Sequence, residues 1–71
     1  MEKSRNVLEV RPLEAGGWQI IDREMGALPL PYDSKEEAIA MARLRAERAG
    51  ASVRVFDVAG TMESAWSYGL D

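Results

Sequence analysis

The stretch Tyr-Asp-Ser-Lys-Glu-Glu-Ala-Ile-Ala-Met-Ala at residues 32–42 decides the fold, because it specifies where a helix begins. Ser34 can accept a hydrogen bond from a free amide of the first helical turn. Glu37 can reach back to the Ser34 amide and complete a capping box. Glu36 and Glu37 also lie where the positive end of the helix dipole favours carboxylates. The pattern predicts a helix over about residues 35–49, ended by a glycine in the left-handed conformation.

The predicted helix has one stripe of small residues. At about 100° per residue the stripe contains Ala38, Ile39, Ala42, Ala46 and Ala49. Because alanine is small, the helix can approach a sheet closely and leave room for a large residue opposite, for which Trp18 is the candidate. A second apolar strip lies on the flank of the helix and contains Ala40, Met41 and Leu44.

On both sides of the helix the sequence alternates as strands do. Strands are predicted at residues 6–11, 18–23, 52–58 and 61–68, with turns at residues 14–17 and 59–60. Met62 is expected to point inward. The connection at residues 25–31 contains two prolines, which exclude a helix. We expect it to be extended and to pack Leu28, Leu30 or Tyr32 beneath the helix.

The order β-β-α-β-β predicts an α+β fold. We expect a four-stranded, mainly antiparallel sheet with one α-helix packed on one face. The chain is expected to be a single small domain over residues 1–71, with an ordered core at about residues 6–68 and a frayed segment at residues 1–5. The strand order stays open, because two hairpins around a helix can be joined by either pair of edges.

The composition argues against catalysis. The chain has 71 residues with no cysteine and no histidine. It therefore lacks disulfides, thiolate zinc ligands and the commonest general base. Its carboxylates are dispersed, its hydroxyl groups lack a neighbouring base, and both of its lysines lie in polar stretches. We expect a non-enzymatic protein with no catalytic residues, no metal site and no cofactor.

The charge and the hydropathy pattern bear on partners and location. The formal charge is −3, from nine basic and twelve acidic side chains. No apolar run approaches the ~20 residues of a membrane span, and the first residues lack the apolar region of a signal peptide. We expect a cytoplasmic protein without membrane contact. The thin core of so small a domain also favours a homodimer.

Several positions occur together in an order typical of one family. They are Val10, Gly17, Trp18, Ile20, residues 32–39, Ala42, Ala46, residues 53–55, Gly60 and residues 67–69. In these positions the chain resembles the domain of unknown function family 2188, small bacterial proteins without an established activity. The resemblance covers residues 7–69 and departs from the family pattern at residues 28–31 and 58–59. It implies no catalytic residues.

We expect the binding surface on the face of the sheet opposite the helix, which is called the outer sheet face below. Alternation places on it Val7, Ile21, Phe56 and either Trp66 or Ala65, among Glu9, Arg11, Gln19, Arg23 and Arg54. Aromatic residues and arginine are enriched in protein interfaces. We expect an interaction module that self-associates through this face or through the helix strip of Met41 and Leu44, or that binds a protein partner. The expected interface residues are Ile21, Phe56, Trp66 and Arg54 on the sheet, with Met41 and Leu44 on the helix.

Single-stranded nucleic acid is the alternative partner for the same face. Apolar groups interleaved with arginines on an open sheet can stack bases. The residues that would bind are Phe56, Trp66, Arg11, Arg23 and Arg54. The acidic total charge and the lack of an aromatic RNA-binding signature favour the protein partner.

Overall fold

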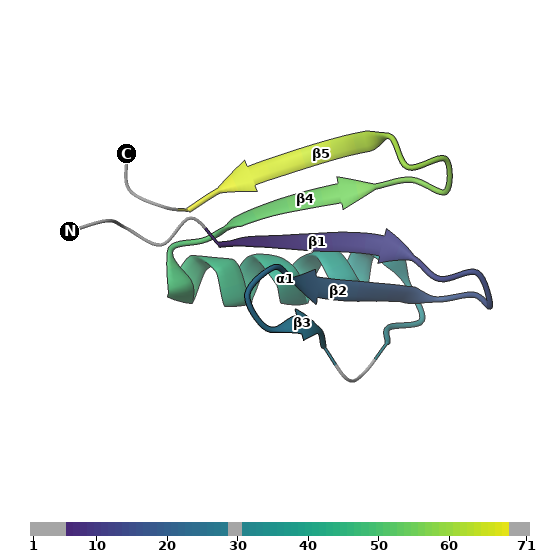
Figure 1. The fold of residues 1–71 in the computed structure, drawn as a ribbon, viewed down its shortest axis with the longest axis horizontal. Coiled ribbons are helices and arrows are strands. Elements are labelled where there is room, and N and C mark those ends of the chain that lie inside the picture. The colour runs from purple at the N-terminus through teal and green to yellow at the C-terminus, as the bar shows by residue number, and fades with distance from the viewer. Residues whose placement is uncertain (1–5, 29–30, 69–71) are drawn as a thin grey trace.

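The computed structural model describes residues 6–28 and 31–68, which form a five-stranded sheet with one helix on one of its faces (Figure 1). The elements are β1 (Val7–Pro12), β2 (Trp18–Asp22), β3 (Gly26–Ala27), α1 (Lys35–Ala49), β4 (Ser52–Phe56) and β5 (Met62–Ser67). The predicted α+β class with one helix is confirmed. The predictions for residues 1–5 and for Leu30 lie outside the described residues.

The sheet differs from the predicted one in two details. The strand order is β3-β2-β1-β4-β5, and the extra strand β3 pairs with β2. A two-residue strand is too short to produce an alternating pattern. In addition, β1 and β4 pair in parallel at the centre, whereas the other three ladders are antiparallel. The helix separates β1 and β2 from β4 and β5 in the chain, and a crossover of this kind returns a strand parallel to an earlier one.

Both ends of α1 form where the sequence predicts them. The hydroxyl oxygen of Ser34 accepts a hydrogen bond from the Glu37 amide at 3.0 Å. Gly50 has a φ of 68° and its amide donates to the Ala46 carbonyl. The second bond of the capping box, from the Ser34 amide to the Glu37 carboxylate, stays a prediction.

The core lies between α1 and the sheet. Ala38, Ala42 and Ala46 are each 0% exposed, and they face Leu8, Val10, Ile20, Val53 and Val55. Around this cluster pack Trp18, Leu28, Tyr32, Ile39, Trp66 and Tyr68. Ala49 is exposed, so the buried stripe is shorter than predicted. The small side chains of the stripe let α1 lie close to the sheet.

A backbone bridge holds the start of β2 against the segment that leads into α1. The Trp18 amide donates to the Tyr32 carbonyl at 2.8 Å, and the Tyr32 amide donates to the Trp18 carbonyl at 2.7 Å. Gly17 has a φ of +86°, and a Cβ atom there would lie 3.0 Å from the Tyr32 carbonyl oxygen. Glycine therefore suits this position for its conformation and for its lack of a side chain.

The β4–β5 hairpin contains a bulge. The register shifts between Val55 and Phe56, and Phe56 pairs with Met62. Met62 is 51% exposed, so the prediction that it points inward is wrong. The bulge inserts one residue into β5, which reverses the alternation on either side of it. Glu63 forms an ion pair with Lys35 at the start of α1.

Candidate interaction surface

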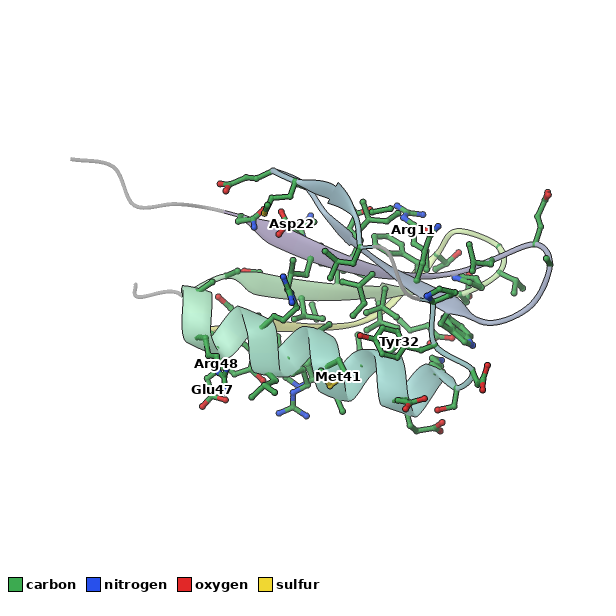
Figure 2. The ribbon with its side chains drawn as sticks, turned by 90° about the horizontal axis from the view of Figure 1, so that it is seen from below. Arg11, Asp22, Tyr32, Met41, Glu47 and Arg48 are labelled. Atoms are coloured by element: carbon green, nitrogen blue, oxygen red, sulfur yellow. The ribbon has the colours of Figure 1, made fainter. Side chains whose placement is uncertain are left out.

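The outer sheet face is not covered by the helix of the described chain, since α1 packs on the opposite side. Figure 2 shows Arg11 on the side of the sheet that faces away from α1 and Tyr32 between the sheet and α1. A row of residues crosses the outer sheet face from β3 to β5 and contains Ala27, Ile21, Glu9, Arg54 and Ala65. The next row contains Gln19, Arg11 and Phe56.

Glu9 organises the charges of this face. Its carboxylate accepts hydrogen bonds from Arg11 Nε at 2.9 Å and from Arg23 Nη2 at 3.0 Å. Burial raises the pKa of the Glu9 carboxyl, but the hydrogen bonds and charges of the two arginines outweigh it, so this pKa lies below its usual value of 4.5. The Glu9 side chain is 12% exposed. An ionised and largely buried Glu9 therefore fixes the guanidinium groups of Arg11, in β1, and of Arg23, the residue after β2.

Arg11 also covers the aromatic ring of the face. Its guanidinium carbon lies 3.9 Å from the centroid of the Phe56 ring, in a cation–π contact. Arg54 lies beside Glu9 in the β1–β4 register and forms no ion pair with the described residues. Three arginines against one glutamate give this face a formal charge of +2, although the whole chain carries −3.

Trp66 does not belong to the outer sheet face, although the sequence allowed it there. It pairs with Val53, which is buried beneath α1, and it packs against the core cluster. The Arg43 guanidinium lies 4.7 Å from its ring centroid. Ala65, opposite Arg54, takes the place on the outer face. The bulge in β5 causes this outcome, because a shift of one residue moves each side chain to the other face.

The predicted interface residues lie on separate surfaces. Ile21, Arg54 and Phe56 are together on the outer sheet face. Met41 and Leu44 are exposed on α1, on the other side of the sheet. The structure therefore brings together the sheet residues without Trp66, and it does not bring them together with the helix residues.

Sequence reasoning missed a hollow at the end of the molecule where α1 finishes. Its volume is about 380 Å³, and it is lined by Asn6, Leu8, Asp22, Glu24, Met25, Arg45, Arg48, Ala49 and Ala51. The signal that could have revealed it is Asp22, which alternation places on the buried face of β2 with Trp18 and Ile20. A carboxylate on a buried face needs partners.

Asp22 has those partners in the β2–β3 turn and in Asn6, the residue before β1. It is 6% exposed, and its Oδ1 accepts hydrogen bonds from Asn6 Nδ2 at 2.9 Å and from the amides of Glu24 at 2.8 Å and Met25 at 3.1 Å. Burial raises the pKa of Asp22, but these hydrogen bonds and the charge of Arg45 outweigh it, so the pKa lies below 3.8. Asp22 thus holds the turn in place as an ionised carboxylate.

The described residues contain neither a metal-binding cluster nor a membrane-spanning helix. No group of three or more histidine, cysteine, aspartate or glutamate residues in residues 6–28 and 31–68 is placed to hold a metal ion. Within the same residues, no helix is long and apolar enough to cross a membrane.

Comparison with known proteins places the chain in a family. Comparison with curated proteins and with solved structures found no match. A family model described as "Uncharacterized protein conserved in bacteria (DUF2188)" matches residues 8–68, which is most of the chain. This range includes the helix start, the Gly17–Trp18 pair and the outer sheet face from Glu9 to Ala65. The chain therefore belongs to the DUF2188 family.

Proposed function

We propose that this chain is a non-enzymatic interaction module that binds an acidic protein surface with its outer sheet face. The observation that supports the proposal is the fixed arrangement of Arg11, which is held by Glu9 and stacked 3.9 Å from the Phe56 ring. A guanidinium that is already oriented loses less conformational entropy when it binds a carboxylate. Ile21 and Phe56 supply apolar contact area between the arginines.

The positive charge of the outer sheet face favours an acidic protein partner over a second copy of the chain. Self-association through this face would set the same three arginines, Arg11, Arg23 and Arg54, against their copies. Like charges opposed across an interface weaken it. An acidic surface would instead pair with the formal charge of +2 on this face, which makes it the better partner. The cytoplasmic location expected from the sequence stays a prediction.

Single-stranded nucleic acid is less suited to this arrangement. Proteins that bind single strands stack bases on open aromatic rings. With Trp66 on the helix side, the described strands place one aromatic ring, Phe56, on the outer face, and Arg11 already covers it. Nucleic acid is therefore kept as an outcome of the test below.

The test is a titration followed by two-dimensional NMR of the ¹⁵N-labelled chain. The probe is a short synthetic peptide of alternating glutamate and phenylalanine, which presents both charges and apolar groups. We expect shifts at amides of β1, β2 and β4. Arg54→Glu should weaken binding by about tenfold or more, since it replaces an attraction with a repulsion. The matched control is Arg48→Glu, which makes the same charge change on the exposed surface of α1.

Three results would contradict the proposal. Equal weakening by Arg48→Glu and Arg54→Glu would indicate general attraction to charge and no specific face. A dimer in sedimentation that Phe56→Glu converts to a folded monomer would indicate self-association through the outer sheet face. Tight binding of a mixed single-stranded oligonucleotide with a steep dependence on salt would indicate the nucleic-acid function.

A further inference from the structure

The two edges of the sheet differ in how they are protected. Exposed edge strands invite pairing with another chain, and natural proteins block this with short strands, prolines, charges or bulges. The edge strand β3 is two residues long. The opposite edge strand, β5, has six residues with no proline and with Glu63 as its one charge. Its bulge lies at its first residues, so Ser64–Ser67 forms a regular edge, and no further strand of residues 6–28 and 31–68 pairs with it.

The outward direction of the β5 backbone follows from its pairing with β4. The Tyr68 amide donates to the Ala51 carbonyl at 3.0 Å. In the observed register, the backbone groups of Trp66 and Ser64 then also point toward β4. The groups of Ala65 and Ser67 alternate with them and point away from the sheet, where the described chain has no further strand.

We propose that β5 pairs antiparallel with β5 of a second copy, about a two-fold axis at Ala65, so that two sheets become one. This register brings the outward backbone groups of both copies together over the regular part of the strand. Ala65 then lies opposite Ala65 of the second copy. Ser64 lies opposite Trp66 of the second copy on the helix side, so a small side chain meets a large one. The strand is therefore complementary to itself.

The surroundings of β5 leave room for a second strand. On the helix side, the Arg43 side chain covers Trp66 and donates to the Tyr68 hydroxyl at 2.7 Å. Beside it lies a hollow of about 280 Å³, lined by Ala40, Arg43, Leu44, Glu47 and Tyr68. α1 packs over β1, β2 and β4. It therefore does not block the β5 edge, and an added strand would extend the floor of this hollow.

Pairing at this edge would also change the outer sheet face. A two-fold axis perpendicular to a sheet keeps both helices on one side and both outer faces on the other. The dimer would therefore present two outer faces side by side, each with Arg11 stacked on Phe56. This inference does not depend on the proposed function, because neither Arg54 nor Phe56 takes part in the edge contact.

Cross-linking tests the register directly, because the chain contains no cysteine. Residues opposite each other in a hydrogen-bonded antiparallel pair have Cα atoms about 5.5 Å apart, which is within the range of a disulfide. The variant Ala65→Cys should therefore form a covalent dimer rapidly under mild oxidation. Ala27→Cys is the matched control, because Ala27 is an exposed alanine on the opposite edge strand. It should cross-link much more slowly.

A second variant tests pairing without a cross-link. The Ala65 amide points away from β4, so Ala65→Pro removes a donor that the single chain does not use in its own sheet. The wild-type chain should reach twice its 7.9 kDa in sedimentation at high concentration. The proline variant should stay at 7.9 kDa with an unchanged circular dichroism spectrum.

The result that overturns the inference is equal cross-linking of Ala65→Cys and Ala27→Cys, together with a wild-type monomer at every concentration. A covalent dimer that forms only when a strand-forming peptide is absent would support it further, since the peptide would compete for the same edge. Ala65→Cys combined with Arg54→Glu should still cross-link. Loss of binding to the glutamate–phenylalanine peptide together with retained cross-linking would agree with both proposals. Retained binding of that peptide without cross-linking would overturn the edge contact alone.

Discussion

At the scale of single residues, Asp22 makes the stability of the fold depend on pH. Its carboxylate accepts hydrogen bonds from two backbone amides of the β2–β3 turn and from the side-chain amide of Asn6. These bonds favour the ionised form, and the pKa of the folded state lies below 3.8. A carboxyl whose pKa is lower in the folded state stabilises the fold at pH values above its unfolded pKa. That stabilisation is lost as the pH falls through the folded pKa.

The variant Asp22→Asn should therefore lower the free energy of unfolding at neutral pH. Hydrogen bonds to a charged group contribute about 1.5–3 kcal/mol, so we expect a loss of about 1–3 kcal/mol. The difference from wild type should shrink as the pH falls from 3.8, the ordinary pKa of an aspartate in the unfolded chain, through the lower pKa of the folded state. Urea unfolding at several pH values measures it. A difference that is independent of pH would show that the charge of Asp22 does not stabilise the turn.

Local signals predicted single residues well where the alternation was uninterrupted. Ser34 and Gly50 begin and end α1 as expected. The predicted turn at residues 59–60 also forms, and there the Asp57 carboxylate accepts hydrogen bonds from the amides of Ala59 and Thr61, both at 2.9 Å. Met62 was placed on the wrong face and Trp66 was left between the two faces, because both positions depend on the bulge in β5. A bulge inserts one residue without a distinctive sequence, and the period of two then assigns the residues around it to the wrong faces.

At the scale of elements, the sequence predicted the helix and four strands but not their neighbours in the sheet. Strand β3 pairs with β2 over two residues, which is too short for a pattern. The parallel pairing of β1 with β4 joins segments that are far apart in the chain. Alternation reports which face of a strand is buried, and it does not report which strand lies beside it. The open outer sheet face was predictable, because one helix can cover one face.

The distance between α1 and the sheet depends on the alanine stripe. Ala42 is 0% exposed at the middle of that stripe. Ala42→Leu should destabilise the chain by about 1–3 kcal/mol, because the added carbons have no space and push the helix away from the sheet. Ala40→Leu is the control, since Ala40 is exposed on the same helix, and its effect should be small. Thermal unfolding of both variants measures the difference. Equal stability of the two variants would show that the helix does not pack closely.

At the scale of the whole molecule, a thin core and an unprotected edge point to the same consequence. A domain of 71 residues buries a smaller share of its unfolded surface than a larger domain does, and the regular part of β5 leaves backbone groups without a partner strand in the described chain. Edge pairing would satisfy those groups and enlarge the sheet. A single added strand is a small interface, so the dimer should be weak and in equilibrium with the monomer.

Such an equilibrium couples stability to concentration. A partner that binds only the folded chain stabilises it by mass action, so the wild-type melting temperature should rise with protein concentration. For a domain of this size we expect about 3–5 °C for each tenfold increase above the dissociation constant. The Ala65→Pro variant should melt at one temperature at all concentrations, whereas Phe56→Glu should keep the concentration dependence, because its side chain lies on the outer sheet face. If Phe56→Glu removes the dependence and Ala65→Pro retains it, the copies meet through the outer face, and the acidic partner proposed for that face would have to compete with a second copy of the chain.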